Sequence, residues 1–258
     1  MTDTLDIQQQ ALAYQCPPNA LKERVILVTG AGEGIGRTAA LTLADHGATV
    51  ILLGRTQDKL EKVYDDIKAA GGPEPALTPV NLEVMTPENA QELAQMFLQE
   101  FGRLDGLLHN ASLLGDITPL QEYGCGTWNS VMQVNLNAAF YLTRAMMPLL
   151  MKSDDASVLL TSSSVGRKGR AFWGAYAVSK FATEGLMQVL ADELENTSNI
   201  RVNSINPGAT RTRMRAQAYP GEDPKTLRTA EEIMPTYLYL LGPDSKGVTG
   251  QALDAFKS

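Results

Sequence analysis

The chain has 258 residues, of which 44% are hydrophobic and 20% are charged, a composition typical of one globular domain rather than a disordered chain. It carries 22 Lys and Arg against 29 Asp and Glu, a net charge of −7, so it lacks the basic surface that nucleic acids and anionic membranes require. Two cysteines, Cys16 and Cys125, and two histidines, His46 and His109, are too few for a disulfide framework or a His/Cys metal site.

Targeting and membrane signals are missing from the sequence. Residues 1–10 are polar and have no apolar core, unlike a secretory signal. The longest apolar candidate, residues 137–151, contains Arg144 and is shorter than the roughly 18 residues of a membrane span. We therefore expect a cytoplasmic protein.

Apolar runs alternate with segments of helical composition from residue 24 onwards. Residues 1–23, which include Pro17 and Pro18, are expected to form an extension ahead of a single domain, 24–258. Strands are predicted at residues 24–29, 49–53, 76–82, 104–108, 157–161, 200–205 and 249–254. Helices are predicted at residues 35–46, 57–70, from about 87 onwards, 128–151 and 175–195.

This alternation predicts an α/β fold with a doubly wound parallel sheet of the Rossmann type and helices on both faces. Ligands of such sheets bind at the carboxyl ends of the strands. Residues 210–243 interrupt the alternation with prolines and short helical pieces. We expect them to form a helical substrate lid.

A glycine-rich turn follows the first predicted strand. It reads Thr-Gly-x-x-x-Gly-x-Gly, with Gly30, Gly34 and Gly36 at the spaced positions and Gly32 between them. Glycines there allow a tight turn and close approach of a pyrophosphate to the start of the next helix. The same turn is compatible with a plain strand–helix connection, but the strand before it and the helix after it favour nucleotide binding.

Tyr176 and Lys180 lie four residues apart in a predicted helix, so both side chains share one helix face. A lysine ammonium favours the phenolate and should lower the tyrosine pKa, which suits a general acid/base. The spacing is also common in surface helices, so its interpretation as a catalytic pair depends on the glycine-rich turn.

These two motifs together resemble the short-chain dehydrogenase/reductase family over about residues 24–254, and the segments around Tyr176 and Asn206 are similar to a bacterial subgroup of uncharacterised oxidoreductases. The resemblance implies hydride transfer between a nicotinamide cofactor and a ketone, aldehyde or alcohol. It implies four catalytic residues: Asn135 holding a relay water, Ser163 polarising the carbonyl, Tyr176 as acid/base, and Lys180 tuning Tyr176 and binding the nicotinamide ribose.

The resemblance also implies the residues that contact the cofactor. Besides Tyr176 and Lys180 these are Gly30, Gly32, Glu33, Gly34, Ile35, Gly36, Arg55, Asn81, Leu82, Asn110, Ala111, Pro207, Gly208 and Thr212. His109 and Ser112 stand where relatives have Asn and Gly, and we expect His109 to be structural. The change at Ser112 matters only if that backbone position needs a positive φ.

The residues at the end of the second strand predict which cofactor binds, because an NAD site would have an acidic residue there. This chain has Gly54 and Arg55, and an arginine can pair with the 2′-phosphate of NADP, so NADP is favoured over NAD. Alternatively, Arg55 is a solvated loop charge. Glu33 opposes NADP, and Arg37 is a candidate to compensate for it.

Several alternatives stay open. Arg211, Arg213 and Arg215 either recognise an anionic substrate or form a solvated helix face. A non-catalytic nucleotide sensor could use the same fold, although it would not need the four catalytic residues. The partner is expected to be a small molecule, with neither nucleic acid nor membrane. The wide apolar arc of helix 175–195 predicts a homodimer or homotetramer.

Overall fold

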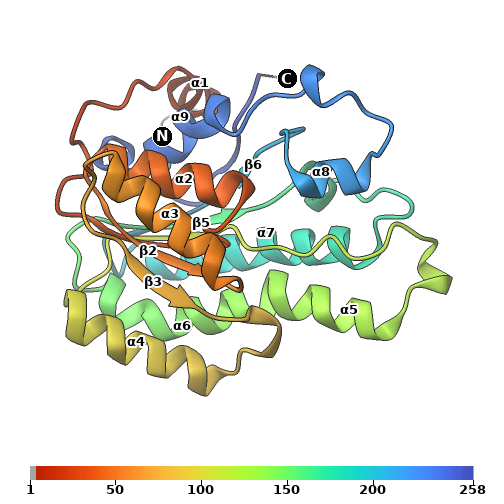
Figure 1. Cartoon of the computed structure of the whole chain (residues 1–258), viewed down its shortest axis with the longest axis horizontal. Helices are drawn as coiled ribbons and strands as arrows, with labels where there is room; N and C mark the ends of the chain where they lie inside the picture. Colours follow the sequence, from red (N-terminus) through yellow and green to blue (C-terminus); the bar gives the residue numbers. More distant parts are fainter. Residues whose placement is uncertain (1–3, 258) are drawn as a thin grey trace.

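A computed structural model describes residues 4–257, which contain one seven-stranded parallel sheet in the order β3-β2-β1-β4-β5-β6-β7 (Figure 1). The strands are β1 Val25–Thr29, β2 Thr49–Gly54, β3 Ala76–Pro79, β4 Gly106–His109, β5 Ala156–Thr161, β6 Ile200–Asn206 and β7 Ala252–Asp254. The helices are α1 Thr4–Ala13, α2 Gly34–Asp45, α3 Gln57–Ala69, α4 Pro87–Phe101, α5 Cys125–Met132, α6 Ala138–Leu150, α7 Gly174–Leu194, α8 Arg213–Ala218 and α9 Met234–Leu241. The predicted doubly wound fold is confirmed.

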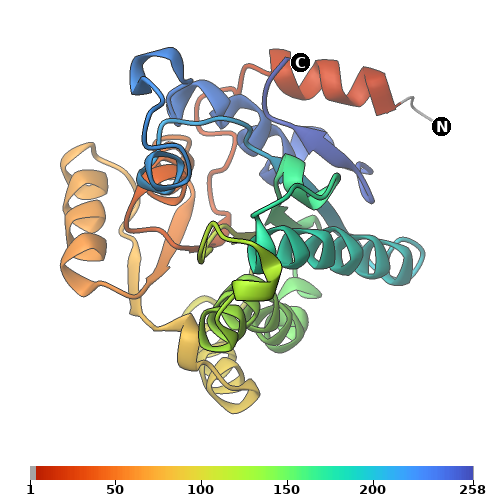
Figure 2. The same cartoon turned by 90° about the vertical axis from the view of Figure 1, so that its right-hand side faces the viewer.

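Alternate residues of each strand supply two separate cores, as the two-residue period of a strand requires. In β1, Ile26 and Val28 pack with α1, α2, α3 and α9, whereas Leu27 between them packs with α4, α6 and α7. Figure 2 shows these two helical layers on either side of the sheet. Because both faces are covered, β1, β2 and β4 are almost entirely apolar, whereas β6 also buries Arg201, Asn203 and Ser204.

The strand order reverses direction beside β1. Leu27 of β1 lies opposite Ile51 of β2 on one side and Leu107 of β4 on the other. The connection from β3 returns the chain to β4, so the segments after β1 and β4 diverge at the carboxyl edge of the sheet. This is the place where open α/β sheets bind ligands.

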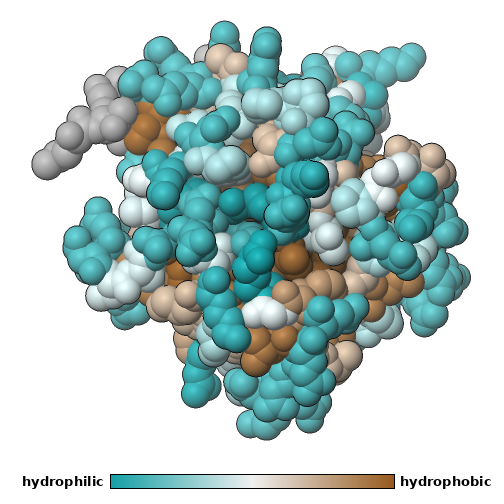
Figure 3. All heavy atoms as spheres, turned by 90° about the vertical axis from the view of Figure 1, so that its left-hand side faces the viewer, coloured by the Kyte–Doolittle hydropathy of each residue, from teal (hydrophilic) through white to brown (hydrophobic). Residues whose placement is uncertain are grey.

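The opposite face of the molecule, which contains the amino ends of the strands, is hydrophilic over its upper part and carries apolar residues in its lower half (Figure 3). Ion pairs join residues at the start of the strands: Arg24 binds Asp155 at 3.1 Å, and Arg201 binds the same carboxylate at 2.9 Å. They join β1, β5 and β6 at the end away from the ligand edge. No helix in residues 4–257 is long and apolar enough to cross a bilayer.

Several predicted elements differ in detail, and the last strand begins at Ala252 rather than at residue 249. Strand β3 ends at Pro79 rather than at residue 82, because Asn81 accepts a hydrogen bond from the Glu83 N–H at 3.1 Å and starts a 3-10 turn, Leu82–Val84. The long helix predicted at 128–151 begins at Cys125 and contains a π-helical turn, Gln133–Asn137, between α5 and α6. Such turns often occur at functional sites, and this one carries Asn135.

The segment ahead of β1 is packed against the domain. Ile7 and Ala11 of α1 are buried against α9. The Gln8 side-chain amide donates to the Asp254 carbonyl at 2.6 Å and accepts from the Asp254 N–H at 2.8 Å. The first helix therefore connects to the last strand of the sheet, and Figure 2 shows α1 next to the C-terminal end of the chain.

The region predicted as a lid divides into two parts. Helix α9 belongs to the core, because Tyr237 and Leu240 are almost completely buried. Helix α8 lies at the carboxyl edge of the sheet, where Met214 and Ala218 pack beside the Tyr176 cluster. Of the segment predicted as a lid, only residues 210–229 precede the buried helix and lie outside it.

Candidate functional site

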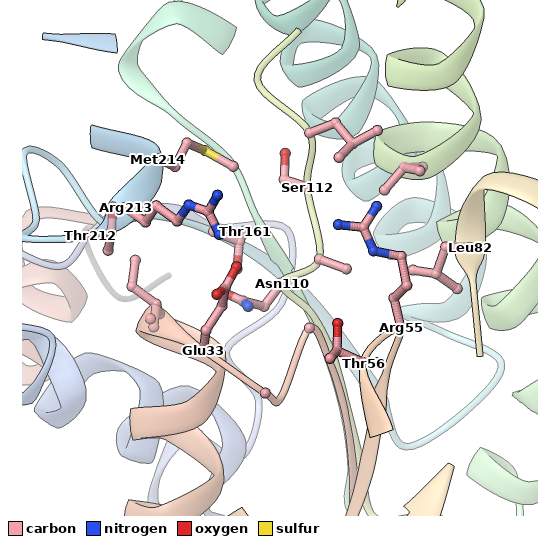
Figure 4. Close-up of a pocket in the computed structure, with 18 of the residues that line it drawn as sticks. Glu33, Arg55, Thr56, Leu82, Asn110, Ser112, Thr161, Thr212, Arg213 and Met214 are labelled. Carbon is pink, nitrogen blue, oxygen red and sulfur yellow. The ribbon is translucent and has the colours of Figure 1, made fainter. Parts of the chain in front are cut away.

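A cleft of about 320 Å³ opens at the carboxyl edge of the sheet, between the segments that follow β1, β2, β3, β4, β5 and β6 (Figure 4). Most of the predicted site residues line it: Gly30, Gly32, Glu33, Gly34, Ile35, Arg55, Asn81, Leu82, Asn110, Ala111, Tyr176, Lys180, Pro207 and Thr212. Four predicted residues, Gly36, Asn135, Ser163 and Gly208, are not among the lining residues. The cleft is also lined by residues that were not predicted as cofactor contacts: Thr56, Lys59, Glu83, Ser112, Ser162, Arg213 and Met214.

In the glycine-rich turn, the backbone at Gly36, near the start of α2, packs closely against the backbone of Gly30. A Cβ on Gly36 would lie 2.2 Å from the Gly30 carbonyl oxygen, so Gly36 has a packing role beneath the cleft. Gly30 and Gly34 have φ of +69° and +56°, which favours glycine at both positions. No side chain caps the start of α2, so its first N–H groups are available to an anion.

Thr29 connects the ends of β1 and β4. Its hydroxyl oxygen accepts hydrogen bonds from the N–H groups of Asn110 at 3.0 Å and Ala111 at 3.1 Å. The Asn110 side chain donates back to the Thr29 carbonyl at 3.3 Å. Ser112 follows without a positive φ, so replacing glycine there causes no backbone strain.

Tyr176 is 8% exposed and lines the inner part of the cleft. Burial raises the pKa of Tyr176 to about 12, and a hydrogen bond with Ser163 acts in the opposite direction. The shift is opposite to the one expected from a neighbouring lysine. Removing the phenolate from water costs more free energy than the hydrogen bond to Ser163 restores. At neutral pH the phenol therefore keeps its proton and can donate it.

Lys180 is 3% exposed and lies one helical turn from Tyr176. Its ammonium donates to the Thr161 carbonyl at 2.7 Å and lies 5.6 Å from the centre of the Tyr176 ring. Burial lowers the pKa of Lys180 to about 8, while the carboxylate of Glu184 raises it. Lys180 is thus a buried cation at the inner end of the cleft that remains charged at neutral pH.

Asn135 links two segments around the cleft. Its amide accepts from the Leu113 N–H at 2.7 Å and donates to the Leu113 carbonyl at 3.0 Å and to the Ser179 hydroxyl at 2.9 Å. A separate cavity of about 10 Å³ lies between Asn135 and Lys180. That volume is about the size needed for one water molecule.

His109 is buried, and its Nε2 lies 2.8 Å from the Thr143 hydroxyl. Burial lowers the pKa of His109 to about 3, so the ring is neutral at physiological pH. These contacts agree with the predicted structural role. Within residues 4–257, no group of three or more His, Cys, Asp or Glu side chains is arranged to hold a metal ion.

The outer end of the cleft is basic on one side. Arg55 is exposed after β2 and extends along the cleft wall (Figure 4). Lys59, near the start of α3, also lines the cleft and forms an ion pair with Glu33. Arg37 instead binds Asp66 at 2.6 Å and is not a lining residue. Lys59, rather than Arg37, therefore offsets the charge of Glu33.

These groups fit an extended anionic ligand such as a dinucleotide. The glycine-rich turn and the start of α2 suit a diphosphate, and Arg55 and Lys59 suit a further phosphate at the outer end. The buried hydroxyls of Ser112 and Ser162 line the cleft, and neither has a hydrogen-bond partner among residues 4–257. Buried polar groups normally have partners, so these hydroxyls indicate that a polar ligand completes the site.

Comparisons with known proteins agree with this geometry. Residues 24–223 match the family model described as short chain dehydrogenase. The uncharacterised oxidoreductase YciK of Escherichia coli K12 is 56% identical over 242 residues, which are 94% of this chain and 95% of the relative. This similarity confirms the predicted bacterial subgroup.

Two solved structures are similar over nearly the whole chain. A short-chain dehydrogenase from Pseudomonas syringae is 61% identical, with a TM-score of 0.93 over 94% of this chain and 98% of its own. One from Shigella flexneri, described in complex with NADP, is 56% identical, with a TM-score of 0.90 over 93% of this chain and 99% of its own. With this fold, this cleft and these matches, the chain belongs to the short-chain dehydrogenase/reductase family of oxidoreductases.

Proposed function

We propose that the protein transfers hydride between NADPH and the carbonyl carbon of a ketone or aldehyde, with Tyr176 as the general acid. One observation carries the proposal: the buried Tyr176 and Lys180 line the same cleft as the glycine-rich turn. A nucleotide-binding protein without catalysis would not need a buried phenol and a buried ammonium one helical turn apart. Such a pair is expensive to bury, which favours a chemical role.

Bound NADPH would supply the hydride, held by the glycine-rich turn, Lys180 and Thr212. The protein's own residues handle the proton. Tyr176 is protonated at neutral pH and donates its proton to the carbonyl oxygen as the alcohol forms. Ser163 is close enough to hydrogen-bond Tyr176 and would donate a second hydrogen bond to the same carbonyl oxygen.

Tyr176 must recover its proton after each turnover. The water-sized cavity between Asn135 and Lys180 supports a route through one water molecule and the lysine ammonium. The cavity borders Lys180, whose pKa of about 8 lets it lose and regain a proton near neutral pH. Asn135 would hold this route in place, because its side chain ties Leu113 to Ser179.

The preference for NADP over NAD follows from charge at the outer end of the cleft. Arg55 has no hydrogen bond or ion pair with any residue in the range 4–257, and Lys59 also lines the cleft. A guanidinium can bind phosphate oxygens with two parallel hydrogen bonds. The relative from Shigella flexneri, whose structure is described with NADP, supports the same choice for this chain.

An Arg55→Ala variant should bind NADPH about ten-fold or more weakly than the wild type, because it loses a charge-assisted hydrogen bond to the 2′-phosphate. Binding of NADH, which lacks that phosphate, should change little. Fluorescence titration of both variants with both nucleotides measures the difference. An equal loss for NADPH and NADH would contradict the role of Arg55, and a wild type that binds neither nucleotide would contradict the proposed function.

We also propose that the protein is a homodimer or homotetramer assembled through α7. Val178, Phe181 and Val189 are 42%, 46% and 56% exposed along one stripe of this helix. Phe140 of α6, also on this side of the sheet, is 45% exposed. Rows of large apolar side chains on adjoining helices are typical of surfaces that a second copy covers.

Phe181→Asp should shift the oligomer towards monomer, because the interface would then bury a carboxylate. Light scattering should give a mass above 27.9 kDa for the wild type and a lower mass for the variant. Met96→Asp changes a side chain that is 58% exposed on α4 and serves as the control, with an unchanged mass expected. A monomeric wild type would disprove the proposed assembly.

A further inference from the structure

The three arginines that follow β6 have different surroundings. Arg211 donates to the carbonyls of Pro224 at 2.7 Å and Leu227 at 3.3 Å, so it holds the loop after α8. Arg215 forms two hydrogen bonds of 2.6 Å with the carboxylate of Glu222. These two guanidinium groups are occupied by the protein itself.

Arg213 differs from both. It is exposed, it lines the cleft, and its guanidinium has no hydrogen bond or ion pair with any residue in the range 4–257. Figure 4 shows its side chain extending from the start of α8 over the cleft, towards the side of the glycine-rich turn that carries Glu33. Arg213 is therefore available to an anionic ligand, whereas Arg211 and Arg215 are bound by groups of the protein.

The start of α8 rests on the glycine-rich turn. The methyl group of Thr212 lies 3.6 Å from the position that a Cβ on Gly34 would occupy. Arg213 is the next residue, so its side chain starts within one residue of this contact. A diphosphate bound to the turn would thus lie between the uncapped N–H groups of α2 and the guanidinium of Arg213.

We propose that Arg213 binds the diphosphate of the dinucleotide from the lid side and so fixes α8 over the occupied cleft. This inference rests on the proposed cofactor. Lys59 lies against Gly32 and is paired with Glu33, whereas Arg213 approaches the turn from α8 and has no partner among residues 4–257. The nearby carboxylate of Glu33 is offset by Lys59, which reduces its competition for the guanidinium.

Fixing α8 has a consequence for the substrate side of the cleft. Met214 and Ala218 of α8 pack beside Tyr176, and Trp173 completes this apolar cluster. When the diphosphate holds Arg213, these apolar side chains are held against the reacting carbonyl. Arg213 is thus a positioning residue that couples cofactor binding to closure of the substrate side.

The test measures, by fluorescence titration, how tightly NADPH and NADH bind to the wild type, to Arg213→Met and to Arg213→Lys. Both nucleotides contain the diphosphate, so Arg213→Met should raise both dissociation constants about ten-fold or more. Arg213→Lys should have a smaller effect, because an ammonium keeps the charge but not the planar pair of donors. Arg55→Ala, in contrast, should weaken NADPH alone.

Lys225→Met provides the matched control, because it removes one exposed charge from the same region without a cleft contact. Both dissociation constants should stay at the wild-type values. Unchanged binding of both nucleotides to Arg213→Met would overturn the assignment, and so would a rise limited to the KM of an anionic carbonyl substrate. If the wild type binds neither nucleotide, the proposed function itself fails.

Discussion

Tyr176→Phe should reduce turnover roughly 10²–10⁴-fold while leaving the affinity for NADPH close to that of the wild type. Phenylalanine keeps the ring that packs beside Trp173 at 5.7 Å and removes only the hydroxyl group. The developing alkoxide then loses its proton donor. Steady-state rates with a panel of carbonyl compounds, together with an NADPH titration, separate the chemical step from binding.

Tyr219→Phe is the matched control for this prediction. Its hydroxyl accepts a hydrogen bond from Arg170 at 2.9 Å, and its ring contacts Trp173, yet Tyr219 does not line the cleft. Turnover of this variant should stay near the wild-type rate. An active Tyr176→Phe variant would remove Tyr176 from the mechanism, and a wild type that binds NADPH but reduces no carbonyl compound would favour the sensor.

Gly36→Ala should cost about 1–3 kcal/mol of stability and weaken NADPH binding by at least about ten-fold. The added methyl group would meet the Gly30 carbonyl oxygen at 2.2 Å and the Asn110 side chain at 2.5 Å. The first of these contacts is with backbone, so α2 must move away from the turn. That movement displaces the N–H groups that face the diphosphate, and thermal melts with an NADPH titration would detect both effects.

Gly126→Ala tests whether the effect comes from the clash. Gly126 lies in α5, and a Cβ at this position would have no atom within 4 Å. The substitution should leave NADPH binding unchanged and stability within about 1 kcal/mol of the wild type. If Gly36→Ala binds NADPH as tightly as Gly126→Ala, the close packing of the turn does not control the site.

The strand–helix alternation and the two motifs were enough to predict the fold and the end of the sheet that carries the cleft. Both depend on local signals: apolar runs such as residues 49–53, and glycines at positions where a Cβ would clash. The same local signals do not predict contacts between side chains that are far apart in the sequence. The pairing of Lys59 with Glu33 crosses from α3 to the glycine-rich turn, and only the packing of those two segments brings it about.

The electrostatics of the site could not be predicted from the sequence either, because they depend on burial. From the sequence, the neighbouring lysine was the visible influence on Tyr176, and it predicted a lowered pKa. In the folded chain the phenol lies away from solvent, and desolvation moves its pKa upwards. The π-helical turn at Asn135 was equally hidden, because its residues are compatible with an ordinary helix.

The contact between Gln8 and Asp254 has a consequence for self-association. A strand at the border of a sheet exposes unpaired peptide groups, which can template the addition of a strand from another molecule. Gln8 satisfies both the N–H and the carbonyl of Asp254 with a side-chain amide, imitating a neighbouring strand without providing one. Helix α1 thus covers the border of the sheet at Asp254, where it should hinder the fibre-like addition of strands, and leaves the apolar stripe of α7 as the surface that we propose for a symmetric partner.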